Sequence, residues 1–242
     1  MNIQKKSTPG LINWTSYLAI TCLVIVPLAV LTVRSGAWQQ GLLLYAIGAL
    51  GSTLIAIVCI VLLMLPRFRQ WRAKVVKHAL LPAIPGAVLL MSLTSGGNYP
   101  AIHDITTDTA DPPGFLAAEA RRGDDANTLA IKPEVIEQQT QAYPDLQSLR
   151  SPLTIDEAFS RAVAVASAMG WEIYTEDRNK GIIEAVDTTR IMRFKDDVVI
   201  RVRGDEQGAI IDTRSVSRIG QSDLGANANR IRAFQAAFAT AG

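Results

Sequence analysis

Three uncharged, mostly apolar runs stand at the start of the chain. They extend from Ser7 to Val33, from Leu42 to Leu65 and from Ala79 to Ser95. At about 1.5 Å per residue, the first two are long enough to cross a hydrocarbon core of about 30 Å. The third is shorter and contains Pro82 and Pro85, so a re-entrant or interfacial segment is its alternative. The pattern predicts a three-span membrane anchor over residues 1–97, with spans at about 15–33, 42–65 and 79–97.

The first run also has two features of a signal peptide, because Lys5 and Lys6 precede an apolar stretch. That stretch continues to Val33 without a clean small-residue cleavage site, and two further apolar runs follow it. A retained span is therefore favoured over a cleaved one.

Basic residues flank these runs asymmetrically. Lys5 and Lys6 precede the first run, one arginine lies in the loop 34–41, and the loop 67–78 carries five basic residues. By the positive-inside rule, the N-terminus and the second loop lie in the cytoplasm, and three crossings place residues 98–242 outside. This predicts a multi-pass protein of the cytoplasmic (inner) membrane with a periplasmic or otherwise extracytoplasmic domain. Aromatic residues near the predicted span ends agree with an interfacial belt: Trp14, Trp38, Trp71 and Tyr99.

Residues 98–150 are rich in Asp, Thr and Pro, which favour turns and extended chain. A short helix is expected from Pro133, over the sequence PEVIEQQTQA. We predict that most of this segment wraps the domain that follows it, because apolar anchors recur along it: Ile102, Ile105, Phe115, Tyr143 and Leu146.

Residues 151–242 switch from helical to strand patterns and back. Thr154 and Glu157 have capping-box spacing and begin a helix that ends before Gly170. Four strands joined by the turn-prone links RNKG and GDEQ follow, which indicates an antiparallel sheet. A last helix starts after QSD, with Ser222 or Asp223 as its cap, and its apolar stripe is Leu224, Ala228, Ile231, Phe234 and Phe238. The order α-β-β-β-β-α predicts a two-layer α/β (α+β) domain, an antiparallel four-stranded sheet with both helices on one face.

The turn GDEQ fixes the pairing expected for the last two strands. With Val202 opposite Ala209, the apolar side chains share the core face, and a one-residue slip would bury charged groups in it. The other face then collects the charged side chains Asp197, Arg201, Arg203, Asp212, Arg214 and Arg218. We expect this face to be open and to carry cross-strand ion pairs, with Asp197 facing Arg214 and Arg201 diagonal to Asp212.

Charge divides the chain as hydropathy does. Residues 1–97 carry 8 of the 24 Lys/Arg residues and no acid, whereas residues 98–242 carry the other 16 and all 22 acids, a net charge of −6. The two parts therefore belong to different physical environments. Cys22 and Cys59 lie in predicted spans, so the acidic domain has no disulfide framework and depends on its apolar core. Its negative charge and its lack of interleaved aromatic residues argue against a nucleic-acid partner.

Residues 98–242 contain no complete catalytic motif. Their single histidine, His103, follows the last predicted span, and the sequence has no Gly-x-Ser-x-Gly element, which argues against a hydrolytic triad. Candidate ligands for an oxygen-preferring cation are His103, Asp104, Asp108 and Asp111, but their spacing is not that of an EF-hand loop. The adjacent Asp196 and Asp197 would point to opposite faces of a strand, so we expect them to end a turn rather than form a glycosidase pair. We predict no catalytic residue, no metal site and no cofactor.

Four stretches of the second half resemble a known family: AYPDL, EAFSRAVAVASAMGWEI, IEAVDTTRIMRFKDDVVIRV and IDTRSVSRIGQSDLGANANRIRAF. They are similar to the domain-of-unknown-function family 1499, over about residues 102–238. The block RSVSR-G-SDLG-NA-RI is fairly specific, because its order and spacing recur as a unit in that family. The resemblance implies no activity and no catalytic residues, and it does not extend to the spans in 1–97.

Ligand-binding candidates lie on the arginine face and in the loop that follows it. Gly220, Gly225 and the amides of a helix start could hold an anion with help from Arg218, and helix capping is the alternative explanation. The candidate anion-binding residues are Arg201, Arg214, Arg218, Ser222, Asp223 and Asn227.

Together these patterns favour a non-enzymatic binding or assembly module displayed outside the cytoplasmic membrane. Its expected partners are the lipid bilayer and either an envelope protein or an anionic lipid. The alternative is an enzyme that acts on a lipid or cell-wall component through the arginine face. A deep pocket that combines Arg214 or Arg218 with a carboxylate would favour the enzyme, and a flat charged face would favour the binding module.

Overall fold

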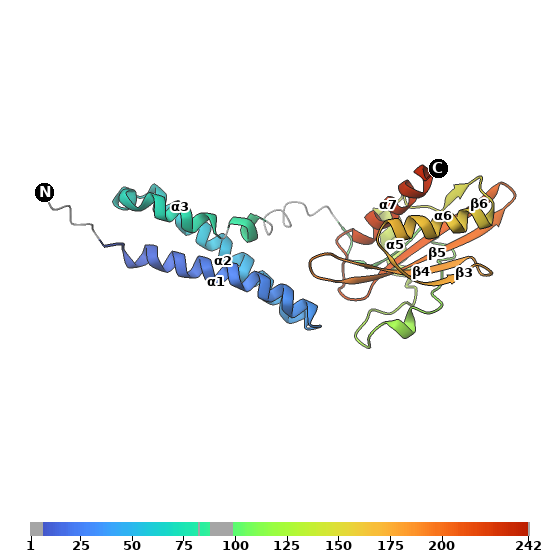
Figure 1. The fold of residues 1–242 in the computed structure, drawn as a ribbon, viewed down its shortest axis with the longest axis horizontal. Helices are drawn as coiled ribbons and strands as arrows, with labels where there is room; N and C mark the ends of the chain where they lie inside the picture. The colour runs from blue at the N-terminus through green and yellow to red at the C-terminus, as the bar shows by residue number, and fades with distance from the viewer. Residues whose placement is uncertain (1–6, 82, 88–98, 242) are drawn as a thin grey trace. The chain divides into compact units, whose positions relative to one another are not determined.

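A computed structural model describes residues 7–81, 83–87 and 99–241 (Figure 1). The chain divides into two compact units, Met1–Gly96 and Gly97–Gly242. Each unit has apolar clusters of its own, so each is treated as a separate body below.

The first unit contains two long apolar helices, α1 (Gly10–Arg34) and α2 (Trp38–Met64). Both are long and apolar enough to cross a membrane, and only 22% and 33% of their most apolar windows are buried. Among the described residues these are the two helices that meet this test, where the sequence predicted three spans. The third predicted span, 79–97, lies largely outside the described residues, so the fold class is confirmed here only for two apolar helices.

Small residues let α1 and α2 approach closely. A Cβ atom on Gly41 would lie 2.7 Å from the backbone nitrogen of Val33, and one on Gly48 would lie 3.0 Å from the side chain of Ile25. Ser52 is fully buried in the same helix. This is the packing expected of membrane helices, where small residues permit backbone contact.

The basic loop after α2 is itself helical. It forms a 3-10 turn, η1 (Pro66–Trp71), and a short helix, α3 (Arg72–Leu80). The chain folds back here, because Lys74 donates a hydrogen bond to the Thr8 hydroxyl (2.7 Å) and Arg72 to the Leu63 carbonyl (3.2 Å).

The second unit is built on an antiparallel sheet with the strand order β1-β6-β5-β4-β3. The four strands expected from sequence are β3 (Glu172–Asp177), β4 (Ile182–Thr188), β5 (Lys195–Asp205) and β6 (Gly208–Ser217). The predicted number of strands is wrong, because β1 (Asp104–Thr106) and β2 (Leu149–Ser151) both pair with the outer edge of β6. Strands of three residues are too short to show a period of two, so the sequence pattern alone does not reveal them.

Helices α6 (Ile155–Ala168) and α7 (Ala226–Thr240) pack on one face of this sheet, as predicted. The capping box of α6 is present, because the Thr154 hydroxyl accepts from the Glu157 amide and the Glu157 carboxylate accepts from the Thr154 amide. In the core, Trp171 stacks on Phe234 with ring centroids 5.6 Å apart. Helix α5 (Pro133–Ala142) and a 3-10 turn, η2 (Glu119–Arg121), precede α6.

A smaller apolar cluster joins the start of the second unit to α7. It contains Ile102, Ile105, Tyr143, Leu146, Ala228 and Ile231. The fifth expected anchor, Phe115, lies instead under the guanidinium of Arg214, 5.5 Å from the ring centroid.

The expected register of β5 and β6 is wrong by two residues. Val202 pairs with Ile211 rather than with Ala209, and the turn consists of Glu206 and Gln207. The strands are longer than predicted because the first two residues of GDEQ still pair, with Gly204 opposite Ala209 and Asp205 opposite Gly208. A shift of two keeps every side chain on its expected face, since the period of a strand is two.

The start of α7 also differs from the prediction. The helix begins at Ala226 after Gly225, which has a left-handed φ of 81°, and Leu224 is 72% exposed rather than part of the apolar stripe. The N-cap is Gly225, so the predicted N-cap at Ser222 or Asp223 is wrong in position. Asp223 still satisfies amides at the helix start, because its carboxylate accepts from the amides of Gly225 and Asn227 (both 2.8 Å).

The core assignment predicts the effect of truncating Trp171, which is 5% exposed. Trp171→Ala should lower the free energy of unfolding by about 3–5 kcal/mol, because a large buried ring leaves a cavity. Leu116→Ala, at a site 47% exposed, is the matched control and should leave stability nearly unchanged. Urea unfolding of residues 97–242, followed by far-ultraviolet circular dichroism, measures both. Equal midpoints for the two variants would show that Trp171 is not a core residue.

Candidate functional site

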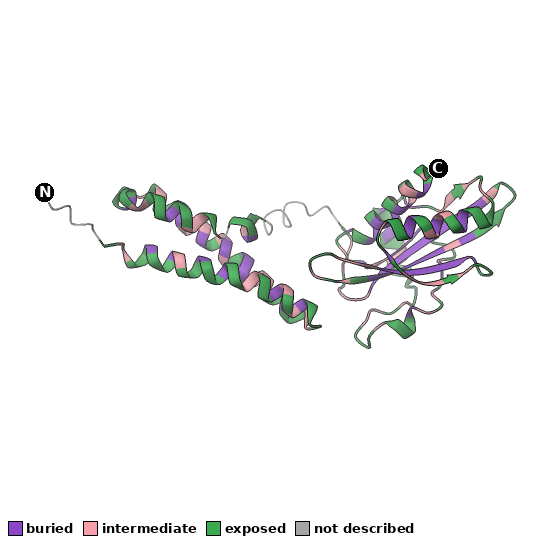
Figure 2. Ribbon diagram, in the orientation of Figure 1, coloured by how far each residue is buried: buried purple, intermediate pink, exposed green. Residues whose placement is uncertain are grey.

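The charged face of the sheet is buried, not open as the sequence suggested. A covering segment, residues 107–131, lies against the face opposite to α6 and α7, and Figure 2 shows the central strands buried along most of their length. The side chains between sheet and segment form a charge layer, which consists of Glu184, Asp197, Arg201, Asp212, Arg214 and Arg218. Its members point away from the apolar core, as the strand period requires.

Arg201 lies at one end of the charge layer. In the observed register it stands directly opposite Asp212, and its Nη2 lies 2.9 Å from an Asp212 carboxylate oxygen. Its other bonds reach the covering segment, with Nη1 2.8 Å from Asp111 and Nη2 3.1 Å from Asp108. The predicted ion pair is confirmed, although the two residues are opposite rather than diagonal.

Asp212 is fully buried and accepts several hydrogen bonds. One carboxylate oxygen accepts from Arg201 and Arg203, and the other from the Ser148 hydroxyl at 2.5 Å. Burial by itself raises the pKa of this carboxyl, but the bonds from Arg203, Ser148 and Arg201 outweigh burial and hold the pKa below its usual value. Asp212 therefore stays ionised and is a poor proton donor or acceptor near neutral pH.

Arg214 is the largest fully buried side chain in the layer, at 2% exposure. It binds both carboxylate oxygens of Asp104, at 2.9 and 2.7 Å, and the carbonyls of Pro113 and Leu129, at 3.2 and 2.8 Å. The predicted pair with Asp197 is wrong, because β1 places Asp104 beside Arg214 and the true register places Val216 opposite Asp197. Arg214 thus holds the covering segment to the sheet at two points, the carbonyls of Pro113 and Leu129.

Arg218 and Arg122 share one carboxylate. Arg218 binds both oxygens of Asp197, at 3.0 and 2.8 Å, and donates to the Arg121 carbonyl at 2.9 Å. Nη1 of Arg122 also lies 2.9 Å from Asp197, but without hydrogen-bond geometry, so this contact is an ion pair only. Burial lowers the pKa of Arg122 despite the attraction of Asp197.

Three polar atoms beside this pair have no hydrogen-bond partner within the described part of the chain. They are Nε and Nη1 of Arg122 and the hydroxyl oxygen of Tyr174, and the Arg122 side chain is only 4% exposed. Burial, together with the nearby charges of Asp197 and Glu184, raises the pKa of Tyr174. Glu184 does not reach them, since its carboxylate accepts from the Leu116 and Ala117 amides at 2.6 and 2.9 Å. A bridging water would satisfy such a site without any ligand.

A second polar cluster fastens α7 to the sheet on the other face. Arg230 lies 2.5 Å from Asp196 and 2.7 Å from Asp187, and Asn227 accepts from the Ser215 hydroxyl at 2.7 Å. Asp196 and Asp197 do point to opposite faces, as expected, but they lie within β5 and not at a turn. Sequence reasoning missed Arg230, although its spacing of three residues from Asn227 places the two on one helical face.

The loop 219–225 is held by its own chain. The Ser222 hydroxyl donates to the Pro100 carbonyl (3.4 Å), and the Asp223 amide donates to the Ile102 carbonyl (3.1 Å). Burial raises the pKa of the Asp223 carboxyl, against the opposing effect of the bonds from the Asn227 and Gly225 amides. The amides proposed for an external anion at the start of α7 are therefore already engaged by Asp223. An anion role for Arg201, Arg214, Arg218, Ser222, Asp223 and Asn227 stays a prediction.

The acidic residues considered as metal ligands bind arginines instead. Asp104 binds Arg214, and Asp108 and Asp111 bind Arg201. Within the described ranges, no three or more His, Cys, Asp or Glu side chains gather in a way that could hold a metal ion. A surface pocket of about 170 Å³ lies elsewhere, between β2 and the β5–β6 turn, and is lined by Arg150, Ser151, Pro152, Asp205, Gln207 and Ala209.

Burial changes the expected cost of removing an arginine. Arg214→Gln should lower the free energy of unfolding by about 3–5 kcal/mol, because it leaves Asp104 with no counter-ion in a buried site. Arg150→Gln is the matched control, since Arg150 is 64% exposed and also pairs with an aspartate, Asp205. Urea unfolding of residues 97–242 compares the two. A loss for Arg214→Gln no larger than for Arg150→Gln would contradict the buried layer.

The lowered pKa of Asp212 predicts how stability changes with pH. A carboxyl with a depressed folded-state pKa contributes stability above its unfolded pKa of about 3.9, and loses it as pH falls through the folded value. Asp212→Asn should therefore be clearly less stable than wild type at pH 7, and the difference should shrink as the pH falls below about 4. Unfolding midpoints in urea at pH 7, 5 and 3 test this. A difference independent of pH would show that the charge of Asp212 is not what matters.

The geometry agrees with what comparison with known proteins shows. A family model described as "Protein of unknown function (DUF1499)" matches residues 104–238, which include the charge layer, both faces of the sheet and nearly all of α7. A search of curated proteins finds no match. The matched residues make up more than half of the chain and agree with the resemblance seen in the sequence. The chain belongs to the DUF1499 family.

Proposed function

We propose that this protein is anchored in the cytoplasmic membrane and displays its C-terminal domain outside the cytoplasm, where the domain binds a partner rather than catalysing a reaction. The observation that carries the proposal is the contrast between the two units. The first exposes long apolar helices, and the second engages its charged groups with one another.

The exposed surface of α1 and α2 supports the anchor. The exposed side chains include Leu43 at 63%, Leu54 at 62% and Ile60 at 57%. A helix in the core of a soluble protein buries such residues, whereas a membrane helix turns them toward lipid. No acidic residue occurs in residues 1–97, and the basic residues follow the helix ends. The exposed surface of these helices is therefore suited to contact with lipid.

Charge asymmetry supports the orientation. Lys5 and Lys6 precede α1, and five basic residues follow α2 in η1 and α3, so both ends of this helical pair belong on the cytoplasmic side. The uncharged residues 79–97 then make a third crossing, which brings residues 98–242 to the outside. With an N-terminus in the cytoplasm, an odd number of crossings is needed for this display.

Binding is favoured over catalysis because the buried carboxylates of the domain are already engaged by arginines. A catalytic acid or base needs a pKa near the working pH and access to substrate. In the charge layer, Asp197 and Asp212 are fully buried and bind two arginines each. The domain has one histidine and no cysteine. The alternative, an enzyme that binds a lipid or cell-wall substrate on the arginine face, requires the covering segment to leave the sheet.

Reporter fusions test the orientation. An export-dependent reporter such as alkaline phosphatase, fused after Gly242, should be active, and a reporter that functions only in the cytoplasm should be silent there. Fusion within residues 67–77 should give the reverse result, because that loop is positive and stays inside.

A chain that lacks residues 79–97 is the matched control for this experiment. It retains α1 and α2 but loses the third crossing, so its C-terminal reporter should report the cytoplasm. Export-dependent activity after residues 67–77, or cytoplasmic activity of the full-length fusion, would overturn the proposed display.

A further inference from the structure

Two loops lie at the same end of the sheet in the second unit. The β4–β5 connection, residues 189–194, leads into Lys195, whose carbonyl accepts from the Arg218 amide at 3.0 Å. The loop 219–225 follows Arg218 and is tied to Ile102 and Pro100. Figure 1 shows the β4–β5 connection and the start of α7 at one end of the sheet. We call this end the proximal tip and define it by Tyr99, Ile191, Arg193, Lys195 and Leu224.

The proximal tip holds apolar side chains in solvent. Leu224 is 72% exposed, Ile191 66% and Tyr99 41%. Gly225 keeps Tyr99 close to this loop, because a Cβ atom on Gly225 would lie 2.6 Å from the Tyr99 ring. Apolar side chains that gather into one exposed patch rimmed by polar groups mark a protein or membrane interaction site.

Backbone strain is concentrated at the same place. Within the described residues, the non-glycine residues with positive φ are Arg193 at 62° and Leu224 at 52°. Both belong to the proximal tip, one on each loop. Leucine rarely adopts this conformation, and Asp223 fixes it here by binding the Gly225 and Asn227 amides. The backbone thus holds the Leu224 side chain outward at a conformational cost, which is typical of a contact site.

The charge of the proximal tip is positive. Arg193 and Lys195 are exposed on the β4–β5 side. Asp223 is turned inward to cap α7, so it does not cancel them. Two exposed acids, Asp124 and Asp125, lie on the loop that the Asn127 side chain ties to the Gly220 carbonyl (2.8 Å). Basic side chains beside an apolar projection suit an anionic headgroup layer above hydrocarbon.

We propose that the proximal tip docks on the anionic headgroups of the bilayer, with Leu224 and Ile191 at the boundary of headgroups and acyl chains and Arg193 and Lys195 on lipid phosphates. The inference rests on the proposed membrane anchor. Chain continuity supports a lipid occupant over a soluble protein, because only a few residues of sequence separate Tyr99 from the end of the apolar unit at Gly96. Tyrosine beside the boundary is also typical of the interfacial belt.

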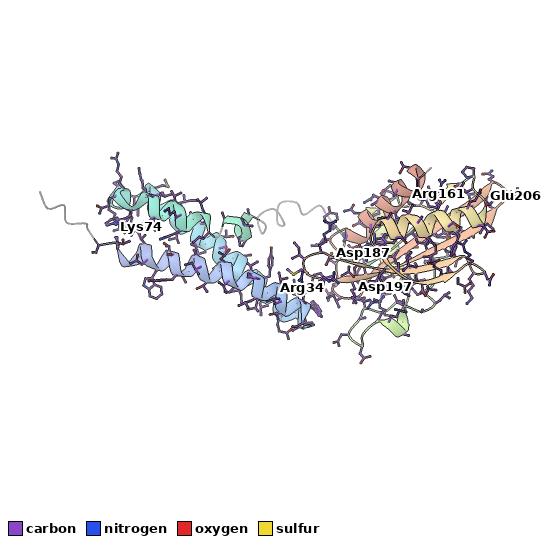
Figure 3. All side chains as sticks on the ribbon, viewed as in Figure 1. Arg34, Lys74, Arg161, Asp187, Asp197 and Glu206 are labelled. Atoms are coloured by element: carbon purple, nitrogen blue, oxygen red, sulfur yellow. The ribbon has the colours of Figure 1, made fainter. Side chains whose placement is uncertain are left out.

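Depth-dependent quenching in lipid nanodiscs tests the docking with the full chain. In a Cys22→Ala, Cys59→Ala background, an environment-sensitive fluorophore is attached at Leu224→Cys or, as a control, at Glu206→Cys. Figure 3 labels Glu206 at the β5–β6 turn, at the other end of the domain from Asp187. Lipids with a spin label near the headgroup should quench the fluorophore at 224 strongly and the one at 206 little, in discs that contain phosphatidylglycerol.

Removal of the two basic side chains at the proximal tip is a second test of the docking. Arg193→Gln with Lys195→Gln should reduce the ratio of docked to undocked tip by about fivefold for each charge, since a basic residue near an anionic surface contributes about that factor. Arg150→Gln with Lys180→Gln removes two exposed charges away from the tip and should change nothing. Discs of phosphatidylcholine alone should show the same reduction in docking, because they carry no anionic lipid.

The possible failures are distinguishable. A chain that does not co-purify with the discs overturns the anchor and this inference together. A chain that enters the discs but shows equal quenching at 224 and 206, or quenching independent of anionic lipid, overturns the docking alone. Blue-shifted emission at 224 without quenching by lipid would mean that a protein surface covers the tip, and it also overturns the lipid assignment.

Discussion

Burial of charge on the second face of the sheet is the constraint on which the domain depends. Asp197, Asp212 and Arg214 are 2% exposed or less, so each must meet an opposite charge inside the protein. Several partners lie on the chain before α5, as with Arg214 and Asp104. Buried ion pairs add little net stability but are costly to break singly. We infer that the charge layer specifies how the covering segment docks, while the apolar core beneath α6 and α7 supplies most of the stability.

The same constraint explains the edge of the sheet. β1 and β2 pair with successive parts of β6, so that edge is covered and does not invite another chain. β1 also carries Asp104, and its pairing of Thr106 with Arg214 sets that carboxylate beside the guanidinium. A slip of one residue would turn Asp104 to the other face and leave Arg214 unpaired. Strand pairing therefore places the charged partners side by side, and the ion pair in turn holds the strand in register. The domain has no cysteine, so no disulfide contributes to this.

Local signals in the sequence predicted local structure well. The Thr154–Glu157 capping box, the core position of Trp171 and the face of each residue in β5 and β6 follow from spacing alone. Contacts between residues far apart in the sequence could not be predicted in this way. The partner of Arg214 depends on a three-residue strand without a detectable period. The turn at Glu206–Gln207 is short because the turn-prone Gly204 and Asp205 pair across the strands. Arg122 and Tyr174 gave no signal, because only tertiary packing brings them to Asp197 and Arg218.

The charge layer also limits where the domain can meet its surroundings. An external anion at Arg214 would have to displace a bidentate carboxylate and two carbonyls, and one at Arg218 would have to displace Asp197. An external ligand would therefore bind more easily to residues outside the charge layer, where it need not displace such ion pairs. The charge-layer residues lie in regular strands or at their ends, whereas the left-handed Arg193 and Leu224 lie in loops. Strained backbone persists where the surrounding structure fixes it, as Asp223 fixes Leu224, and such positions cluster at functional sites. The proximal tip is therefore a stronger candidate for an outside contact than the arginine face.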